Sequence, residues 1–148
     1  MPAAAASLPT TLDPPFLAPL ECVIDLPFPP SANKIWTARG GGHGQLRRSD
    51  EYMAWKRQAG IAAVANGSWR KRVIMPAHFK IVLLLDDAYR RLDKPNARDG
   101  DNCIKPILDW AQSVELVHND ALCDGGEWRW VPKHEAPHGA RLILRSVA

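Results

Sequence analysis

The residues best suited to chemistry are two aspartates that flank a single glycine, in the run Asp99-Gly100-Asp101. Carboxylates at this spacing can converge on one cation, and Mg²⁺ prefers one or two such oxygens together with water and a substrate phosphate. Lys105 follows Asp101 by four residues, within reach of the same site if the intervening turn is helical. The spacing therefore predicts a divalent-cation site beside a lysine that can stabilise charge developing on a phosphate.

Pro106 indicates where the helix that presents these residues begins. Proline is tolerated only in the first turn of a helix, so the helix is expected to start near Asn102. Asp99 and Asp101 then lie at its positive end, where carboxylates are stabilised in the ionised form. The simpler alternative is that these aspartates only cap the helix and that Lys105 forms an ordinary ion pair along it. The local pattern leaves both interpretations open.

Charge is distributed unevenly along a chain whose net charge is only +3. Residues 34–72 contain nine lysines and arginines against two acids, whereas residues 99–127 contain seven acids against one lysine. A basic segment suits a polyanion such as DNA, and an acidic one suits a hard cation. Two solvated surfaces are the alternative, but their coexistence favours a nuclease. The candidate DNA-binding residues are Lys34, Arg39, Arg47, Arg48 and Arg98.

The elements that must position these residues follow from hydrophobic periodicity and from helix caps and breakers. In chain order we expect a strand at 21–28, a long glycine-containing loop at 31–48, a helix from Ser49 to about Asn66, a central strand at 77–85, a helix at about 102–114, a strand pair near 121–132 and a last strand at 140–147. This order predicts one small α/β or α+β domain with a mixed sheet and two main helices.

The length of 148 residues and the 46% hydrophobic content suit one domain, which we place at residues 21–148. Residues 1–20 are rich in proline and alanine and are expected to be a disordered leader. Neither a membrane span nor a signal peptide is apparent, so we expect a soluble cytoplasmic protein. The three cysteines form no C-x-x-C pair and are interpreted as reduced packing residues.

Four motifs occur in a characteristic order: Pro29-Pro30-Ser31-Ala32-Asn33 after the first strand, Ser49 to Trp55 on a helix, D-G-D-N-x-x-K-P-x-x-D from Asp99, and Asn119-Asp120 nineteen residues beyond Asp101. Their ordering and spacing resemble the RusA family of Holliday junction resolvases, from about residue 22 to 145. One difference is Asn119, which stands where the family usually has an acidic residue.

The resemblance implies a RusA-like fold and paired, Mg²⁺-dependent hydrolysis of four-way or related branched DNA in recombination and repair. It implies that Asp99, Asp101 and Asp120 bind the metal, with Mn²⁺ as a possible substitute, and that Lys105 is needed for cleavage. Since a four-way junction has near two-fold symmetry and needs two opposed cuts, the resemblance also implies a homodimer.

Two other classes of protein fit part of this pattern. A non-catalytic DNA-binding protein of the same fold would bind branched DNA without cutting it. A metal-dependent phosphohydrolase for small phosphoesters would need the same acids but not the basic segment.

Overall fold

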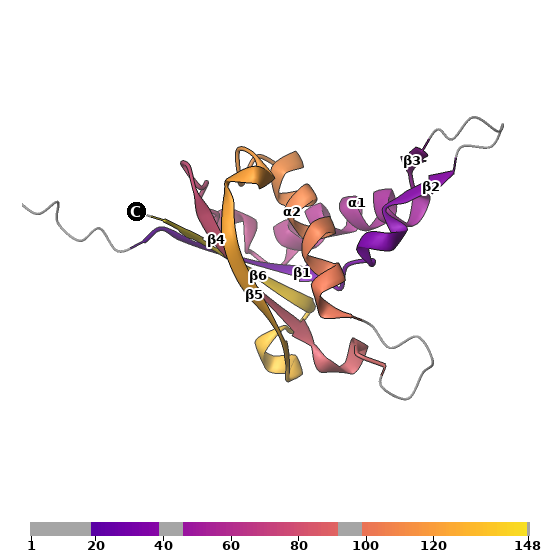
Figure 1. The fold of residues 1–148 in the computed structure, drawn as a ribbon. Helices are drawn as coiled ribbons and strands as arrows, with labels where there is room; N and C mark the ends of the chain where they lie inside the picture. The colour runs from indigo at the N-terminus through magenta and orange to yellow at the C-terminus, as the bar shows by residue number, and fades with distance from the viewer. Residues whose placement is uncertain (1–18, 39–45, 92–98, 148) are drawn as a thin grey trace, which may run out of the picture.

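The computed structural model describes residues 19–38, 46–91 and 99–147. A four-stranded sheet is covered on one side by the two main helices (Figure 1). Its strands, in spatial order, are β1 (Glu21–Pro27), β6 (Gly139–Ser146), β4 (Phe79–Asp86) and β5 (Cys123–Val131), and the helices are α1 (Asp50–Ala65) and α2 (Ile104–Ser113). The expected single α/β domain with a mixed sheet and two main helices is confirmed.

The sheet is mixed because the connection from β4 to β5 is a crossover. β6 runs antiparallel to both β1 and β4, whereas β4 and β5 are parallel and are joined through α2. A parallel pair needs such a crossover connection, most often a helix. The N-terminal end of α2 therefore follows the segment that leaves the end of β4, and its C-terminal end leads back toward the start of β5.

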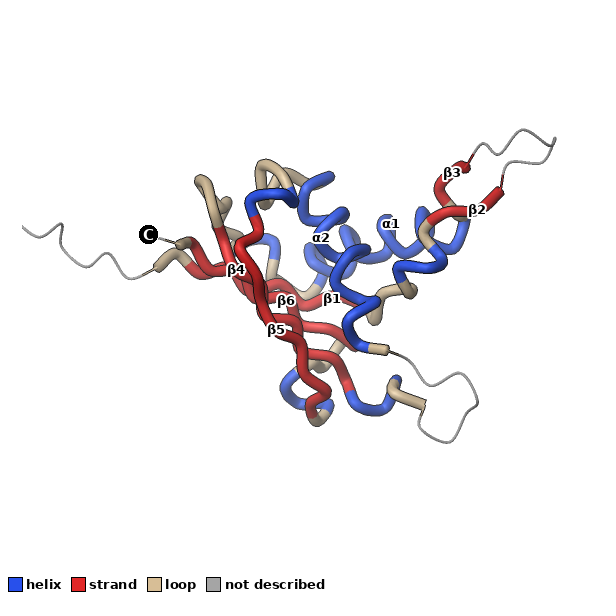
Figure 2. Tube along the Cα trace, in the orientation of Figure 1, coloured by secondary structure: helices blue, strands red, loops and turns tan. Residues whose placement is uncertain are grey.

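Two details of the expected order were wrong. The segment near 121–132 is not a strand pair but the single nine-residue strand β5. The loop expected at 31–48 contains a 3-10 turn, η1 (Ala32–Lys34), and two short antiparallel strands, β2 (Trp36–Ala38) and β3 (Leu46–Arg48). Figure 2 shows β2 and β3 as an arm that projects from the body of the domain. The leader expected at 1–20 lies almost wholly outside the described residues, as do Gly40, Gly41 and Gly42.

The core lies between the sheet and the helices. Alternate side chains along a strand point to opposite faces, and the helix-facing set is almost completely buried: Cys22, Ile24 and Leu26 of β1, Phe79, Ile81, Leu83 and Leu85 of β4, and Ala140, Leu142 and Leu144 of β6. A smaller cluster, Val82, Leu84, Val131 and Ala136, lies on the other face. β4 is therefore covered on both faces, as the continuous apolar run at 77–85 predicts.

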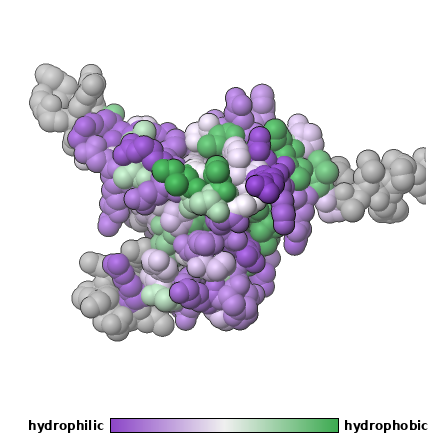
Figure 3. All heavy atoms as spheres, turned by 180° about the vertical axis from the view of Figure 1, so that it is seen from behind, coloured by the Kyte–Doolittle hydropathy of each residue, from purple (hydrophilic) through white to green (hydrophobic). Residues whose placement is uncertain are grey.

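Helix α1 begins and ends where the sequence predicts. The Ser49 hydroxyl accepts a hydrogen bond from the backbone N–H of Tyr52 at 3.1 Å, and Asn66 is the C-cap. Tyr52 and Trp55 are buried and pack in the core. Other apolar side chains of α1, including Ile61 and Val64, are exposed; Figure 3 shows the molecule from behind, with hydrophobic groups scattered among hydrophilic ones.

One polar cluster ties the arm to both helices. Arg48, at the end of β3, forms two hydrogen bonds with the carboxylate of Asp109 on α2, at 3.0 and 3.2 Å. The Tyr52 hydroxyl donates to the same carboxylate, and Lys56 Nζ lies 3.9 Å from it. The Arg48 guanidinium also lies over the ring of Trp36, 4.3 Å from its centroid. Asp109 thus connects the arm, α1 and α2.

The pKa of Asp109 reflects these contacts. Burial alone would raise it, but the hydrogen bonds from Tyr52 and Arg48 outweigh burial and hold the pKa below its ordinary value. Burial and the nearby Asp109 carboxylate together raise the pKa of Tyr52, which stays a hydrogen-bond donor at neutral pH. Because the folded-state pKa of Asp109 is lowered, its ionisation stabilises the fold above pH 3.8 and loses this effect as the pH falls through the lowered value.

Asp109→Asn should therefore destabilise the protein at pH 7 by about 2 kcal/mol, because Arg48 and Tyr52 lose a charged acceptor. Urea denaturation at pH 7 and at pH 3 measures the effect, and the difference from wild type should shrink at the lower pH. Asp87→Asn is the control, since that exposed carboxylate lies 4.0 Å from Arg90 and should contribute less than about 0.5 kcal/mol. Equal effects of the two substitutions would contradict this role of Asp109.

Candidate active site

Asp99 and Asp101 lie on the turn that leads into α2. Asp99 is in an extended conformation, followed by the 3-10 turn η4 (Gly100–Cys103) and then by α2. The helix thus begins close to the position that Pro106 predicts. The Asp99 side chain makes no capping hydrogen bond at η4, so the interpretation of this residue as a simple helix cap is not supported. Both aspartates are exposed.

The Asp99 carboxyl lies close enough to the Asp101 carboxyl to influence its pKa. The hydrogen bond with Asp99, together with slight desolvation and the charge of Asp99, raises the pKa of Asp101 above its ordinary value, while backbone N–H groups partly offset the rise. Two carboxylates this close repel each other when both are ionised. A divalent cation between them would remove that repulsion, so this pair fits a hard cation with oxygen ligands.

Helix α2 is a firm support for this pair. The side chains of Pro106, Ile107, Trp110 and Ala111 are buried, and Leu108 is 9% exposed. These residues form an apolar face that anchors the helix to the core. A site on a packed helix start is held more precisely than one on a free loop.

Gly100 allows the aspartate turn to approach the sheet. A Cβ atom at this position would lie 2.3 Å from Cε3 of the Trp128 indole on β5, much closer than any ordinary contact. Only glycine therefore fits between the two aspartates while the turn stays packed against Trp128. The position of both carboxylates depends on this contact.

Asp120 and Lys105 form a second part of the site. Lys105 Nζ lies 2.5 Å from Asp120 Oδ2, and the backbone N–H of Asp120 donates to Gln112 Oε1 at 2.9 Å. Asn119 caps the following turn, η5 (Asp120–Leu122), by accepting from the N–H of Ala121. Lys105 therefore pairs across the structure with Asp120, and not along its own helix as the simpler alternative would have it.

The structure brings the predicted residues together in two pairs, Asp99 with Asp101 and Lys105 with Asp120. Within residues 19–38, 46–91 and 99–147, no three side chains of His, Cys, Asp or Glu are gathered closely enough to hold a metal ion. Metal binding by Asp99, Asp101 and Asp120 therefore stays a prediction.

A polar cleft of about 630 Å³ opens beside Asp99. Its walls come from the segment after β1, from η1, from the first turns of α1 and from η4; they include Pro29, Pro30, Asn33, Gln58, Asp99 and Asn102. A larger and more apolar cavity of about 1090 Å³ lies elsewhere, along β4, β5 and the chain ends, and none of the four predicted catalytic residues lines it. The polar cleft is therefore the one associated with the candidate site.

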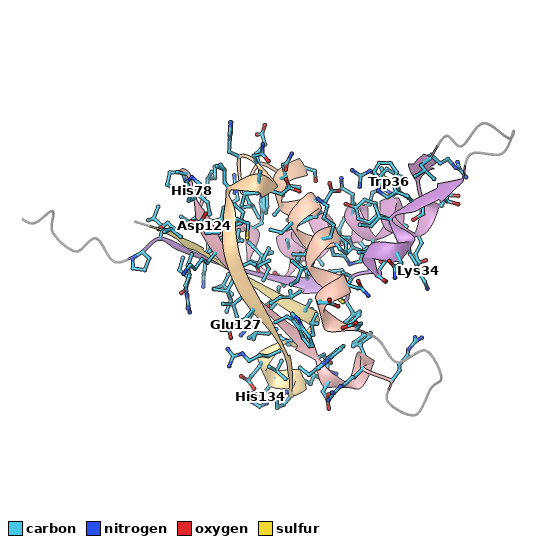
Figure 4. The ribbon with its side chains drawn as sticks, viewed as in Figure 1. Lys34, Trp36, His78, Asp124, Glu127 and His134 are labelled. Atoms are coloured by element: carbon cyan, nitrogen blue, oxygen red, sulfur yellow. The ribbon has the colours of Figure 1, made fainter. Side chains whose placement is uncertain are left out.

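The predicted DNA-binding residues occupy different environments. Lys34 and Arg47 are exposed near the arm, and Figure 4 shows Lys34 and Trp36 together at that end of the molecule, away from His78 and Asp124. Arg48 is bound to Asp109, so its first role is to fix the arm. Arg39 and Arg98 lie outside the described residues.

Three further tryptophans, Trp69, Trp128 and Trp130, are packing residues. Trp69 packs against the core, with its ring 6.3 Å from that of Trp110 in an edge-on arrangement. Trp128 and Trp130 are half-buried and pack against the same core. Of the cysteines, Cys22 and Cys103 are buried in the core and Cys123 is half-buried, as expected for packing residues.

Comparison with known protein families gives a match over most of the chain. The sequence model of the RusA endodeoxyribonucleases matches residues 27–137, which is most of the chain and includes both aspartate segments. The chain belongs to the RusA endodeoxyribonuclease family. No match to the chain was found among curated proteins. None of the helices in the described part of the chain has the length and apolar character needed to cross a membrane.

Some features of this RusA-family site were not expected from the sequence. The link from Arg48 to Asp109 joins residues 61 positions apart, and spacing within a helix gives no signal for it. The cleft was also missed, although Asn33 at the end of the Pro-Pro-Ser-Ala-Asn motif was a signal. The packing of Gly100 against the ring of Trp128 depends on the parallel pairing of β5 with β4. Sequence periodicity alone does not predict that pairing.

Gly100→Ala should disturb the site, because the added methyl group must displace either the aspartate turn or the Trp128 indole. We expect a loss of about 1–3 kcal/mol in stability, as for other overpacked positions, together with lower nuclease activity. Thermal or urea unfolding and a DNA cleavage assay measure the two effects.

Gly60→Ala is the matched control, because a Cβ atom there meets nothing within 4 Å. In the middle of α1 this change should stabilise the fold by about 0.5–1 kcal/mol. If Gly100→Ala were as stable and as active as Gly60→Ala, the packing of Gly100 would not position the site.

Proposed function

We propose that this chain is a divalent-metal-dependent endonuclease that resolves Holliday junctions and related branched DNA, acting as a homodimer. The observation that supports it best is the Asp99–Asp101 pair at the packed start of α2, inside the segment that matches the RusA endodeoxyribonucleases. Mg²⁺ is the expected ion, and Mn²⁺ is a chemically similar substitute.

In this proposal Asp99 and Asp101 hold the cation, with Asp120 as a further ligand. When bound, Mg²⁺ supplies Lewis-acid polarisation of the scissile phosphate and a more acidic water. The carboxylates would fix the position of that cation relative to Lys105. The contact of Gly100 with Trp128 keeps them from moving as charge develops.

Lys105 stabilises negative charge on the phosphate. Its ammonium is more than half exposed and lies beside Asp120, so it is accessible to DNA and oriented at the same time. Fixed positive charge directed at the developing charge lowers the barrier without reorganisation during the reaction. Phosphate binding away from the cut falls to basic residues: Lys34 and Arg47, which are exposed, and Arg39 and Arg98, which lie outside the described residues.

The need for two cuts in each junction supports a dimer. Each chain has one Asp99–Asp101 pair, whereas resolution of a four-way junction needs two opposed cuts. A two-fold symmetric dimer presents two identical sites to a substrate of matching symmetry.

The test is incubation of the protein with a synthetic four-way junction and with a linear duplex, with and without Mg²⁺. We expect paired cuts in the junction only when Mg²⁺ is present. Asp101→Asn should lower the rate by at least about a hundredfold, since an interaction worth several kcal/mol in the transition state is lost.

Glu127→Gln is the matched control, because Glu127 is an exposed acid on β5 that lies outside the site. It should cut like wild type. Equal cutting of duplex and junction would overturn junction specificity, and full activity of Asp101→Asn would overturn the site. Junction binding without any product would support the non-catalytic alternative. Hydrolysis of small phosphoesters but not of DNA, at a rate that the double variant Arg39→Ala with Arg47→Ala retains, would support the phosphohydrolase alternative.

A further inference from the structure

The polar cleft beside Asp99 has features that the cleavage reaction itself does not require. Metal binding and charge stabilisation need only the acids and Lys105, yet the cleft extends from Asp99 to the first turns of α1 and to η1. Its volume of about 630 Å³ lies within the range of about 300–1,000 Å³ typical of small-molecule sites. It is therefore large enough for one nucleotide unit beside the cut.

The charges in the cleft favour a neutral occupant over a phosphate. Lys34 and Arg91 line it, but so do the carboxylates of Glu51 and Asp99. The two signs offset each other, and an anion inside the cleft would meet two negative groups at short range. A nucleobase is uncharged and meets no such repulsion.

The polar groups of the cleft match the edge of a base. Asn33, Gln58 and Asn102 each contribute an amide side chain, and Asn33 and Gln58 are exposed within it. A side-chain amide offers donors and an acceptor together, which is the pairing that base edges require. Three amides in one small cleft are suited to distinguishing bases.

The apolar side of the cleft suits the face of a base. Pro29 and Pro30 are buried, and Trp55 is fixed by a hydrogen bond from its indole N–H to the carbonyl of Pro27 at 3.1 Å. Phe28 also lines the cleft, with its ring stacked on Tyr89 at 4.6 Å between centroids. Flat and rigid apolar walls next to amide groups are the usual surroundings of an extruded base.

We propose that this cleft receives one nucleobase next to the scissile phosphate, and that Asn33 and Gln58 make cleavage depend on which base it is. The inference rests on the proposed function, because Asp99 forms both a wall of the cleft and part of the metal site. A base at the branch point is partly unstacked already, so moving it into the cleft costs less than extruding one from a duplex.

The first experiment measures cleavage of junctions that carry each of the four bases at each position around the branch point. Wild type should prefer one base at one position next to the cut by at least about tenfold, as expected for amide recognition of a base edge. The double variant Asn33→Ala with Gln58→Ala should reduce this preference to about threefold or less and slow cutting at the preferred site. Met53→Ala, an exposed change on the same helix outside the cleft, is the control and should keep the preference.

The second experiment places 2-aminopurine at the preferred position and measures fluorescence on binding in Ca²⁺, without cutting. Binding of the wild-type protein should increase the fluorescence, because the 2-aminopurine base is no longer stacked on its neighbours. Ala54→Phe, which fills the cleft, should remove the increase, whereas Ala65→Phe, at the exposed end of the same helix, should not.

The outcomes separate the two proposals. Cutting of every sequence at one rate, or an unchanged preference in the double variant, would overturn the cleft proposal and leave the nuclease intact. If wild type cut no junction, the proposed function would fail. 2-Aminopurine placed in turn at each position around the branch point would then still decide whether the cleft takes a base. Circular dichroism and thermal unfolding of each variant show whether a loss comes from misfolding.

Discussion

The contact between Gly100 and Trp128 constrains the rest of the site. A turn with two acidic side chains would tend to spread apart, since the ionised carboxylates repel each other. Here the turn is held because its central residue has no side chain and fits against the indole on β5. Helix α2 adds the second restraint, since its buried face fixes the direction in which the turn enters the helix. The raised pKa of Asp101 is the electrostatic consequence of holding the pair together.

Helix α2 also connects segments that are far apart in the sequence. Its first turn presents Lys105 to Asp120, and its next turn presents Asp109 to Arg48 and Tyr52. One face of the helix therefore packs against the core, while Asp109 holds the arm and Lys105 pairs with Asp120. The cleft lies where η4, η1 and α1 meet. A displacement of α2 would thus affect the acids, the arm and the cleft together.

The sequence was most informative where local rules apply. Ser49 and Asn66 mark the ends of α1, Pro106 marks the start of the second helix, and the apolar run at 77–85 marks a strand covered on both faces. The resemblance to the RusA family predicted which aspartates bind the metal. The family match confirms the family but not the role of each residue. The sequence was less informative where packing between distant segments determines the secondary structure. Whether residues 36–38 and 46–48 pair, or whether 121–132 is one strand or two, depends on neighbours that lie far along the chain.

The central claim is that Asp99 and Asp101, held by Gly100, bind the divalent cation. Paramagnetic broadening of backbone amide signals by Mn²⁺, measured by NMR on the wild-type protein, tests it most directly. The account predicts that substoichiometric Mn²⁺ first broadens the amides of Gly100, Asp101 and Asn102, and that excess Mg²⁺ reverses this. Broadening that begins instead at the exposed acids Asp124 and Glu127, with residues 99–102 unaffected, would contradict it.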